Sequence, residues 1–213
     1  MNGSNRNELP ATNTRLANLV ELPFRITFSL SVKLSHSELP TISKRQNLVK
    51  YFKNNPTQMK GDLIRFKTAQ DTCLTQVLEE MKNGKKKSHW MWFVFPQIAG
   101  LGKSTIAKKY EIVNIEEAED YLKDELLSKR LIELTKILAY DINGKTAEEI
   151  FGFPDYLKFH SSITLFYSVV RSNRQFENNS DLICFEDTIN KYYDGKLDKV
   201  TLRILKNRKN SLT

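Results

Sequence analysis

Apolar residues recur every three or four positions through most of the chain after Met59, and this periodicity is what most constrains the fold. Such spacing places the apolar side chains on one face of an α-helix. The first series consists of Leu63, Phe66, Ala69, Cys73, Val77 and Met81. Similar patterns predict further helices at residues 103–110, after residue 114, and at 125–140, 146–152, 155–171, 182–193 and 199–206. We therefore expect an all-α fold, a single irregular domain of about six to eight helices over residues 59–213.

Residues with capping chemistry mark the ends of these predicted helices. Asp62, Asn114 and Asp198 suit N-caps, because their side chains can accept hydrogen bonds from the free amides of a first helical turn. Thr146 and Glu149 have the spacing of a capping box. Gly84 suits the left-handed conformation that often ends a helix.

Residues 1–58 have a different character and are expected to form an N-terminal extension. Residues 1–22 are rich in Asn, Ser and Thr and are expected to be disordered. Residues 24–34 alternate apolar and polar side chains as a strand does, but no second alternating segment follows with which such a strand could pair. A transit peptide is the alternative, although Glu8 and Glu21 argue against it. The extension is expected to be mostly disordered and dispensable, or to arise from an upstream start codon.

Charge is unevenly distributed along the 213 residues, whose formal net charge is +8. Residues 1–60 contain nine Lys or Arg and three Asp or Glu, whereas residues 61–213 contain 24 and 22. A nearly neutral folded part argues against nucleic-acid binding, because a nucleic-acid-binding domain carries its basic patch on its folded surface. The basic tail at 206–209 is expected to be a solvated, frayed terminus.

Composition excludes several other classes of protein. No apolar run is long enough to span a membrane. Two cysteines, Cys73 and Cys184, are too few for a disulfide scaffold or a four-cysteine zinc site and indicate a reducing, cytoplasmic location. The three histidines are far apart in sequence, so no metal site and no cofactor is expected.

The segment from Gly100 to Ser104 resembles the end of a phosphate-binding P-loop. That motif requires a glycine where this chain has Gln97, and a buried strand where it has Pro96, so a P-loop is rejected. Two interpretations remain open for Gly100, Gly102, Lys103 and Ser104. They could offer backbone amides to an anion, or form a tight turn capped by Ser104.

Asp155, Lys158 and Ser162 share one face of the predicted helix at 155–171. A desolvated lysine beside a serine can act as a base for a nucleophilic hydroxyl. The simpler interpretation is a surface ion pair between Asp155 and Lys158 beside a polar helix stripe.

The run from His89 to Gln97 contains two Trp and two Phe and must be largely buried. We expect it to draw His89 and Gln97 toward the interior, where polar groups need partners. A pocket ligand would be one such partner. The alternative is an aromatic core in which backbone carbonyls satisfy the indole and imidazole groups.

Five blocks of this sequence resemble the family called domain of unknown function 1810. They cover roughly residues 61–206 and lie at 62–70, 84–97, 100–104, 150–166 and 193–202. The resemblance implies a small all-helical domain, found mainly in bacteria, with no established activity. Members are sometimes named calpastatin, but that inhibitor is a disordered chain and this one has a globular composition. The chain departs from the family between Tyr121 and Leu131, where Asp124, Glu125 and Ser128 stand in place of a His-Pro pair and a glycine.

These blocks set polar residues among large apolar ones, which favours a polar pocket with aromatic walls. We expect it to bind a small anionic or nucleotide-derived ligand, such as ADP-ribose, and to support hydrolysis or group transfer without a metal. His89 and Lys158 are the candidate catalytic residues, since histidine titrates near neutrality. The candidate ligand-binding residues are Arg65, Gln70, Trp90, Trp92, Gln97, Gly100, Gly102, Lys103, Ser104, Asp155, Ser161, Ser162 and Thr164. The rival hypothesis is a non-enzymatic protein-interaction module in which the same residues form a structural polar core.

Overall fold

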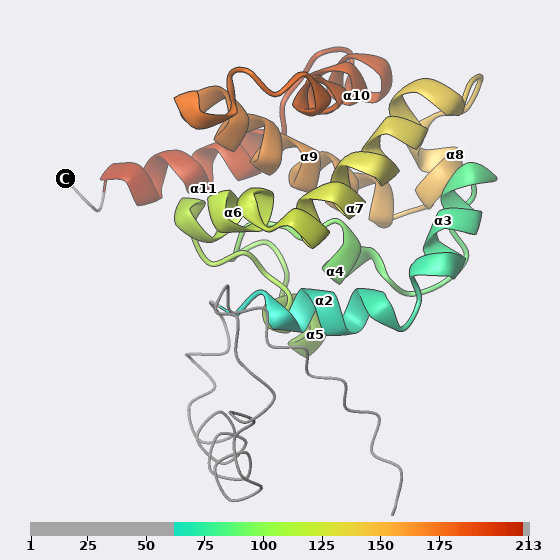
Figure 1. Cartoon of the computed structure of the whole chain (residues 1–213), viewed down its shortest axis with the longest axis horizontal. Helices are drawn as coiled ribbons and strands as arrows, with labels where there is room; N and C mark the ends of the chain where they lie inside the picture. Colours follow the sequence, from blue (N-terminus) through green and yellow to red (C-terminus); the bar gives the residue numbers. More distant parts are fainter. Residues whose placement is uncertain (1–61, 211–213) are drawn as a thin grey trace, which may run out of the picture. The chain divides into compact units, whose positions relative to one another are not determined.

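A computed structural model describes residues 62–210, and every regular element in this range is a helix (Figure 1). The α-helices are α2 (Ile64–Asp71), α3 (Leu74–Lys82), α4 (Met91–Val94), α5 (Thr105–Lys109), α6 (Ile115–Lys123), α7 (Glu125–Lys136), α8 (Ala147–Phe151), α9 (Asp155–Ser172), α10 (Ile183–Tyr193) and α11 (Lys199–Asn210). A π-helical turn, η2 (Ile137–Asp141), and two 3₁₀ turns, η3 (Arg174–Phe176) and η4 (Ser180–Leu182), complete the order. The prediction of an all-α fold is confirmed for these residues.

Helix α9 is the centre around which the other helices pack. It contacts α4, α6, α8, α10 and α11, and its side chains are buried on most of its circumference. Phe159, Ile163 and Phe166 have no exposed surface. The Phe159 ring stacks on Phe151 of α8 at 4.5 Å and meets Phe95 edge-on at 4.8 Å. A helix that is buried on most of its sides is stable only inside such a core.

Most of the predicted caps are present. The side chains of Ser104, Asn114 and Thr146 accept hydrogen bonds from the amides three residues later, and Thr146 completes a capping box with Glu149. Asp198 accepts a hydrogen bond from the Thr201 amide at the start of α11. These signals are local, so sequence spacing alone was enough to place them.

Two expected helices differ from the prediction. The helix expected at 62–82 is divided into α2 and α3, and the break lies at Thr72 and Cys73. The Thr72 hydroxyl donates a hydrogen bond to the Ala69 carbonyl (2.7 Å), and Cys73 leaves helical geometry at φ −142°. The helix expected at 125–140 passes into the π-helical turn η2 after Lys136.

The C-terminal end also differs from the expectation of a frayed tail. Helix α11 continues to Asn210, and the Arg208 guanidinium donates hydrogen bonds to the carbonyls of Ala99 (2.8 Å) and Val113. An arginine that bonds two backbone carbonyls of a distant loop fixes the end of the helix to the domain.

The connection between α4 and α6 contains the only extended pairing in the described range. Ile98 and Ile112 form an isolated parallel bridge, with the Ile112 amide donating to the Gln97 carbonyl at 2.8 Å. The bridge brings the two ends of the 99–111 loop together. Within residues 62–210, no helix has both the length and the apolar character needed to cross a bilayer.

The predictions for residues 1–58 and for the domain boundary at residue 59 lie outside the described residues. The disordered stretch at 1–22 and the alternating segment at 24–34 therefore stay predictions.

Asn114→Ala tests the capping of α6. Its side chain accepts a hydrogen bond from the Glu117 amide at 2.9 Å, so its removal should destabilise the protein by about 1 kcal/mol. Urea unfolding of the full chain measures this loss. Asn143→Ala, at an exposed position where the side chain makes no such bond, is the matched control and should unfold with the parent. Equal stability of the two variants would show that the cap contributes nothing.

Candidate functional site

The carboxylate of Glu80, in α3, organises the loop that precedes the aromatic run. It accepts hydrogen bonds from the amides of Lys87 (2.8 Å) and Ser88 (3.2 Å), the Ser88 hydroxyl (2.6 Å) and the Trp90 indole N–H (2.8 Å). Burial by itself would raise the pKa of Glu80, but these hydrogen bonds outweigh it and lower the pKa to about 2. The loop is therefore anchored on an ionised carboxylate.

Two lysine ammonium groups converge on a second carboxylate beside this loop. Asp155, in the first turn of α9, pairs with Lys86 at 2.6 Å and with Lys158 at 2.7 Å. The Lys86 Nζ atom lies 5.1 Å from the centre of the Trp90 ring, and the Lys158 Nζ atom lies 4.5 Å from that of Trp92. We call the set Lys86, Trp90, Trp92, Asp155 and Lys158 the Trp92 site.

The Trp92 site carries two cations and one anion, so its formal net charge is positive. Burial by itself would raise the pKa of Asp155, but its hydrogen bonds with Lys158 and Lys86 and their positive charges outweigh burial and lower it. The side chain of Lys158 is 22% exposed and that of Lys86 only 7%. Trp90 is buried, whereas Trp92 is half-buried. Lys158 and Trp92 are therefore the members that solvent, or a ligand, can reach most easily.

A small gap lies beside Trp92. It is lined by Gln97, Gly102 and Tyr110 among others, and its volume is about 10 Å³. That is room for one water molecule and for no organic ligand. A Cβ atom on Gly102 would clash with the Cβ of Ala107, so glycine is needed for this close packing.

The sequence-predicted residues of the Gly100–Ser104 segment form a capped turn. The Ser104 hydroxyl accepts a hydrogen bond from the Ala107 amide at 3.2 Å, which confirms the capping interpretation. Gly100 is exposed, at φ 103°, and Lys103 is exposed as well. Helix α5 has five residues, too few to offer the dipole of a longer helix to an anion.

The expectation that His89 is drawn into the interior is wrong, because its side chain is exposed. Ser88 on one side of it is held by Glu80, and Trp90 on the other side is buried. The chain enters the core only at Trp90, so His89 remains outside next to the anchored loop. Gln97, expected inside with His89, is partly buried.

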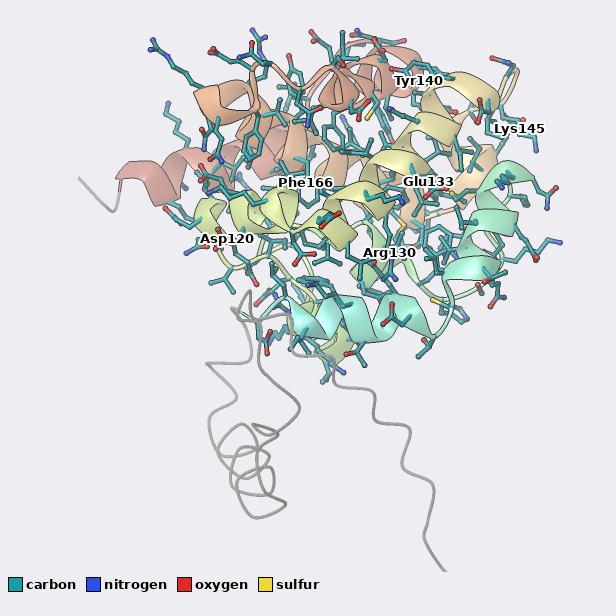
Figure 2. The ribbon with its side chains drawn as sticks, in the orientation of Figure 1. Asp120, Arg130, Glu133, Tyr140, Lys145 and Phe166 are labelled. Atoms are coloured by element: carbon teal, nitrogen blue, oxygen red, sulfur yellow. The ribbon has the colours of Figure 1, made fainter. Side chains whose placement is uncertain are left out.

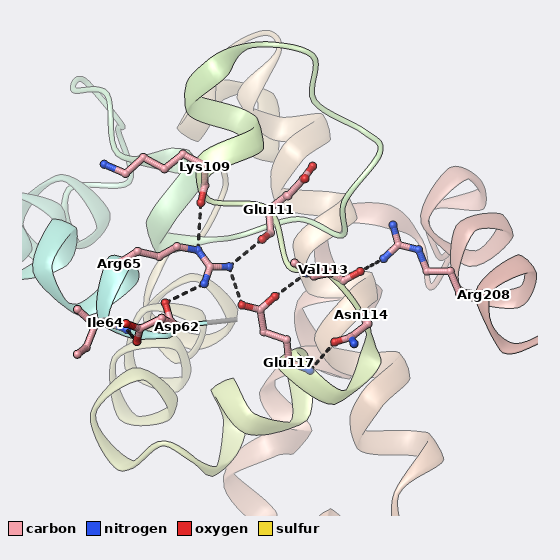
Figure 3. A network of polar contacts seen from close by, with 9 residues as sticks. All are labelled: Asp62, Ile64, Arg65, Lys109, Glu111, Val113, Asn114, Glu117 and Arg208. Atoms are coloured by element: carbon pink, nitrogen blue, oxygen red, sulfur yellow. Dashed lines mark hydrogen bonds and ion pairs between the residues drawn. The ribbon is translucent and has the colours of Figure 1, made fainter. Parts of the chain in front are cut away.

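Arg65, predicted to bind ligand, is instead the centre of a buried protein network (Figure 3). Its guanidinium donates to the carbonyls of Asp62, Lys109 and Glu111 and pairs with the Glu117 carboxylate at 2.6 Å. The other oxygen of Glu117 accepts the Val113 amide at 2.6 Å. The hydrogen-bond donors of the Arg65 guanidinium are thus occupied by Asp62, by α6 and by the loop at 109–113. The structure does not bring the Arg65 side chain to the Trp92 site.

Gln70 is also engaged within the protein. Its amide donates to the Phe93 carbonyl (2.8 Å) and to the Tyr121 hydroxyl (3.0 Å), and its side-chain oxygen accepts from Arg130 (3.3 Å). Arg130 pairs in turn with Asp71 at 2.6 Å. The network joins α2, α4, α6 and α7.

Ser161, Ser162 and Thr164 lie on α9 near the start of α11. The Ser161 hydroxyl donates to the Asp198 carboxylate (3.1 Å), and the Thr164 hydroxyl accepts the Asp198 amide (3.0 Å). The Ser162 hydroxyl is buried and has no hydrogen-bond partner in the described part of the chain. Lys158 is engaged by Asp155, which supports the ion-pair interpretation over a Ser–Lys catalytic pair.

A larger groove of about 770 Å³ runs along the outer side of α7 and η2. Ile132, Lys136 and Ile137 are among its lining residues, as are Glu133 and Tyr140, which Figure 2 labels. None of the predicted site residues lines it. Its charged side chains have both signs, and among residues 62–210 no cluster of His, Cys, Asp and Glu suits a metal ion.

Sequence reasoning missed three residues that arrange this region: Glu80, Lys86 and Glu117. Each acts through a partner distant in sequence or through backbone amides, which no local pattern reveals. One signal was available, since residues 81–110 contain no Asp or Glu to neutralise their lysines. Of these lysines, Lys86 pairs with a carboxylate from another element, Asp155 of α9.

Three comparisons with known proteins bear on this domain. Residues 60–205 match the model of a family described as a protein of unknown function, DUF1810. The crystal structure of the conserved hypothetical protein Rv1873 from Mycobacterium tuberculosis is similar, with 42% identity and a TM-score of 0.62 over 68% of this chain and 96% of that one. A search of curated proteins gave no match.

Glu80→Gln tests the anchoring of the loop through its pH dependence. The native pKa, about 2, lies below the ordinary 4.5, so Glu80 stabilises the fold above pH 4.5 and loses this effect as the pH falls toward 2. The shift corresponds to about 3 kcal/mol. We expect the variant to be less stable than the parent at pH 7 and to lose less stability between pH 5 and pH 3.

Urea unfolding at each pH measures this difference. Glu79→Gln changes an exposed neighbour and should follow the parent at both pH values. Parallel pH profiles of Glu80→Gln and the parent would refute the role given to the Glu80 carboxylate.

Proposed function

Because this chain belongs to the DUF1810 family, whose activity is unknown, we propose a function from its own geometry: the Trp92 site binds the anionic group of a small ligand. The observation that carries the proposal is the pair of ammonium groups that share the single carboxylate of Asp155. One carboxylate neutralises one of them, and the excess positive charge remains at a half-buried position. Such a charge attracts a phosphate or carboxylate more strongly than a fully solvated lysine does.

The anchoring by Glu80 supports this proposal because it keeps the site preorganised. Glu80 fixes Lys87, Ser88 and Trp90, and Lys86 lies inside the same loop. A site whose cations are already placed loses less conformational entropy when a ligand binds.

Exposure indicates how a ligand would be oriented. Lys158 is the more exposed of the two lysines and would meet the anionic group, while the accessible part of Trp92 would contact a base or a sugar. Trp90 is buried and would act only by supporting Lys86. A nucleotide-derived ligand, such as ADP-ribose, combines a phosphate with a flat ring and fits these two contacts.

The small gap beside Trp92 limits the binding mode. A volume of about 10 Å³ excludes an enclosed ligand, so the ligand would lie on the outer side of Trp92 and Lys158. If the bound molecule reacts, the exposed His89 is the acid–base candidate that remains near the anchored loop. Hydrolysis or group transfer would then proceed at the surface of the domain.

One observation favours the second candidate, a non-enzymatic interaction module. Arg65, Gln70, Ser161 and Thr164 are each hydrogen-bonded to other protein groups, in networks separate from the Trp92 site. In this hypothesis the polar residues of the family blocks specify the core, and a protein partner binds elsewhere. The two candidates differ in whether a small anion stabilises the protein.

Thermal shift of the full chain with inorganic phosphate, ribose 5-phosphate, AMP and ADP-ribose tests the proposal. A ligand at one hundred times its Kd adds about 2.7 kcal/mol to the free energy of unfolding. We expect ADP-ribose or AMP to raise the Tm, and Lys158→Gln to abolish the rise. Lys129→Gln removes an exposed lysine of α7 and should keep it. If no compound raises the Tm of the parent, the interaction module replaces the ligand-binding proposal.

A further inference from the structure

The described residues have nearly equal numbers of basic and acidic side chains, but the two kinds are concentrated in different segments. Residues 62–210 contain 24 Lys or Arg and 22 Asp or Glu. Residues 81–110 contain seven Lys and no acidic residue, and residues 199–210 contain five Lys or Arg and no acidic residue. The remaining segments are therefore strongly acidic. An even total is thus no evidence against a basic surface on the folded part.

Helix α11 presents part of this excess as a row. Lys199, Arg203 and Lys206 are exposed, and their spacing of four and three residues places them on one line along the helix. With a rise of about 1.5 Å per residue the row is about 10 Å long. No ion pair neutralises these three side chains within the described range.

The row forms the outermost line of α11. Successive residues turn by about 100°, so Thr201 and Leu205 lie on the opposite side, where both are buried. Val200 and Leu202 are about 41% and 37% exposed and flank the row on its two borders. The outermost line itself carries only cations, whereas a helix that inserts into a lipid surface presents apolar residues there.

The helix is held rigidly enough to present this row as a surface. Asp198 caps its first turn and is itself bonded by Ser161 and Thr201. At the other end Arg208 donates to the carbonyls of Ala99 and Val113, as Figure 3 shows for Val113. These bonds place the end of α11 against the loop that leads to the exposed Lys103, Lys108 and Lys109.

We propose that the α11 row, Lys199, Arg203 and Lys206, binds the phosphate backbone of double-stranded nucleic acid without sequence preference. A rigid line of cations is complementary to the regular line of charges on a duplex strand. The described part of α11 exposes no aromatic side chain on which an unpaired base could stack, which favours a duplex over a single strand. This binding is independent of the Trp92 site and of its ligand.

The test is fluorescence anisotropy of a labelled 20-base-pair DNA duplex with the full chain, over a series of salt concentrations. The variant is the triple Lys199→Gln, Arg203→Gln, Lys206→Gln. The matched control is the triple Lys129→Gln, Arg171→Gln, Arg174→Gln, which removes the same charge from exposed positions on other elements. Both triples keep the basic residues of 1–60, so general attraction by net charge is equal in the two.

We expect the α11 triple to weaken binding at least tenfold at low salt and to reduce the slope of log K against log salt by about 3, since each phosphate contact contributes about 0.9. The control triple should retain the parent's slope. Equal effects of the two triples, or binding that neither changes, would overturn the proposal. So would binding to vesicles rich in phosphatidylserine, but not to the duplex, that depends on the α11 row.

Circular dichroism and the Tm of both triples, compared with the parent, show whether the helix is intact. The three positions are exposed and unpaired, so both variants should fold as the parent does. If the α11 triple is destabilised, a second variant keeps the charge of the row: Lys199→Arg, Arg203→Lys, Lys206→Arg. This variant should bind the duplex as the parent does. Failure of that variant to bind, while folded, would equally count against the proposal.

Discussion

The buried ion pair between Arg65 and Glu117 is the contact on which most of this arrangement depends. Arg65 comes from α2 and Glu117 from α6, and between them they also bond the backbone at 109, 111 and 113. Removing one partner of such a pair leaves a buried charge and costs about 3–5 kcal/mol. The pair joins α2 to the connection between α4 and α6, which the Ile98–Ile112 bridge and the Arg208 bonds also hold. Val113 links α6 and α11, since its amide donates a hydrogen bond to Glu117 and its carbonyl accepts one from Arg208 of α11.

Buried and partly buried carboxylates in this domain mainly accept hydrogen bonds that hold loops and helix ends in place. Glu80 gathers the amides of a basic loop, Glu117 holds a loop amide, and Asp198 joins α9 to α11. In each case one carboxylate satisfies several donors that would otherwise be buried without partners. Glu80, Glu117 and Asp198, polar residues among large apolar ones, thus supply the hydrogen-bond acceptors that loops and helix ends require. The Trp92 site differs, because there the cations outnumber the carboxylate that holds them.

The sequence was sufficient for features that depend on neighbours along the chain. The caps at Asn114 and Thr146, and the ion pair of Asp155 with Lys158, involve residues three positions apart. It was insufficient where a distant partner decides the outcome. The apolar spacing continues through Thr72 and Cys73, so nothing in it marked the break between α2 and α3. Arg65 could not be distinguished from a ligand-binding arginine, because its partner Glu117 is 52 residues away.

Both tryptophans of the chain lie in the one segment anchored by Glu80. The intrinsic emission of the protein at tryptophan wavelengths therefore originates entirely from that segment, however long the rest of the chain is. Trp90 is buried and its indole N–H donates a hydrogen bond to the Glu80 carboxylate. Trp92 is half-buried and its ring lies under the Lys158 ammonium group. The two fluorophores thus have different surroundings. The emission of the buried Trp90 responds to opening of the core, and that of the half-buried Trp92 responds to changes at its exposed edge. The tryptophan emission of the molecule is therefore a local reporter of this segment, and its Trp90 component reports on the core.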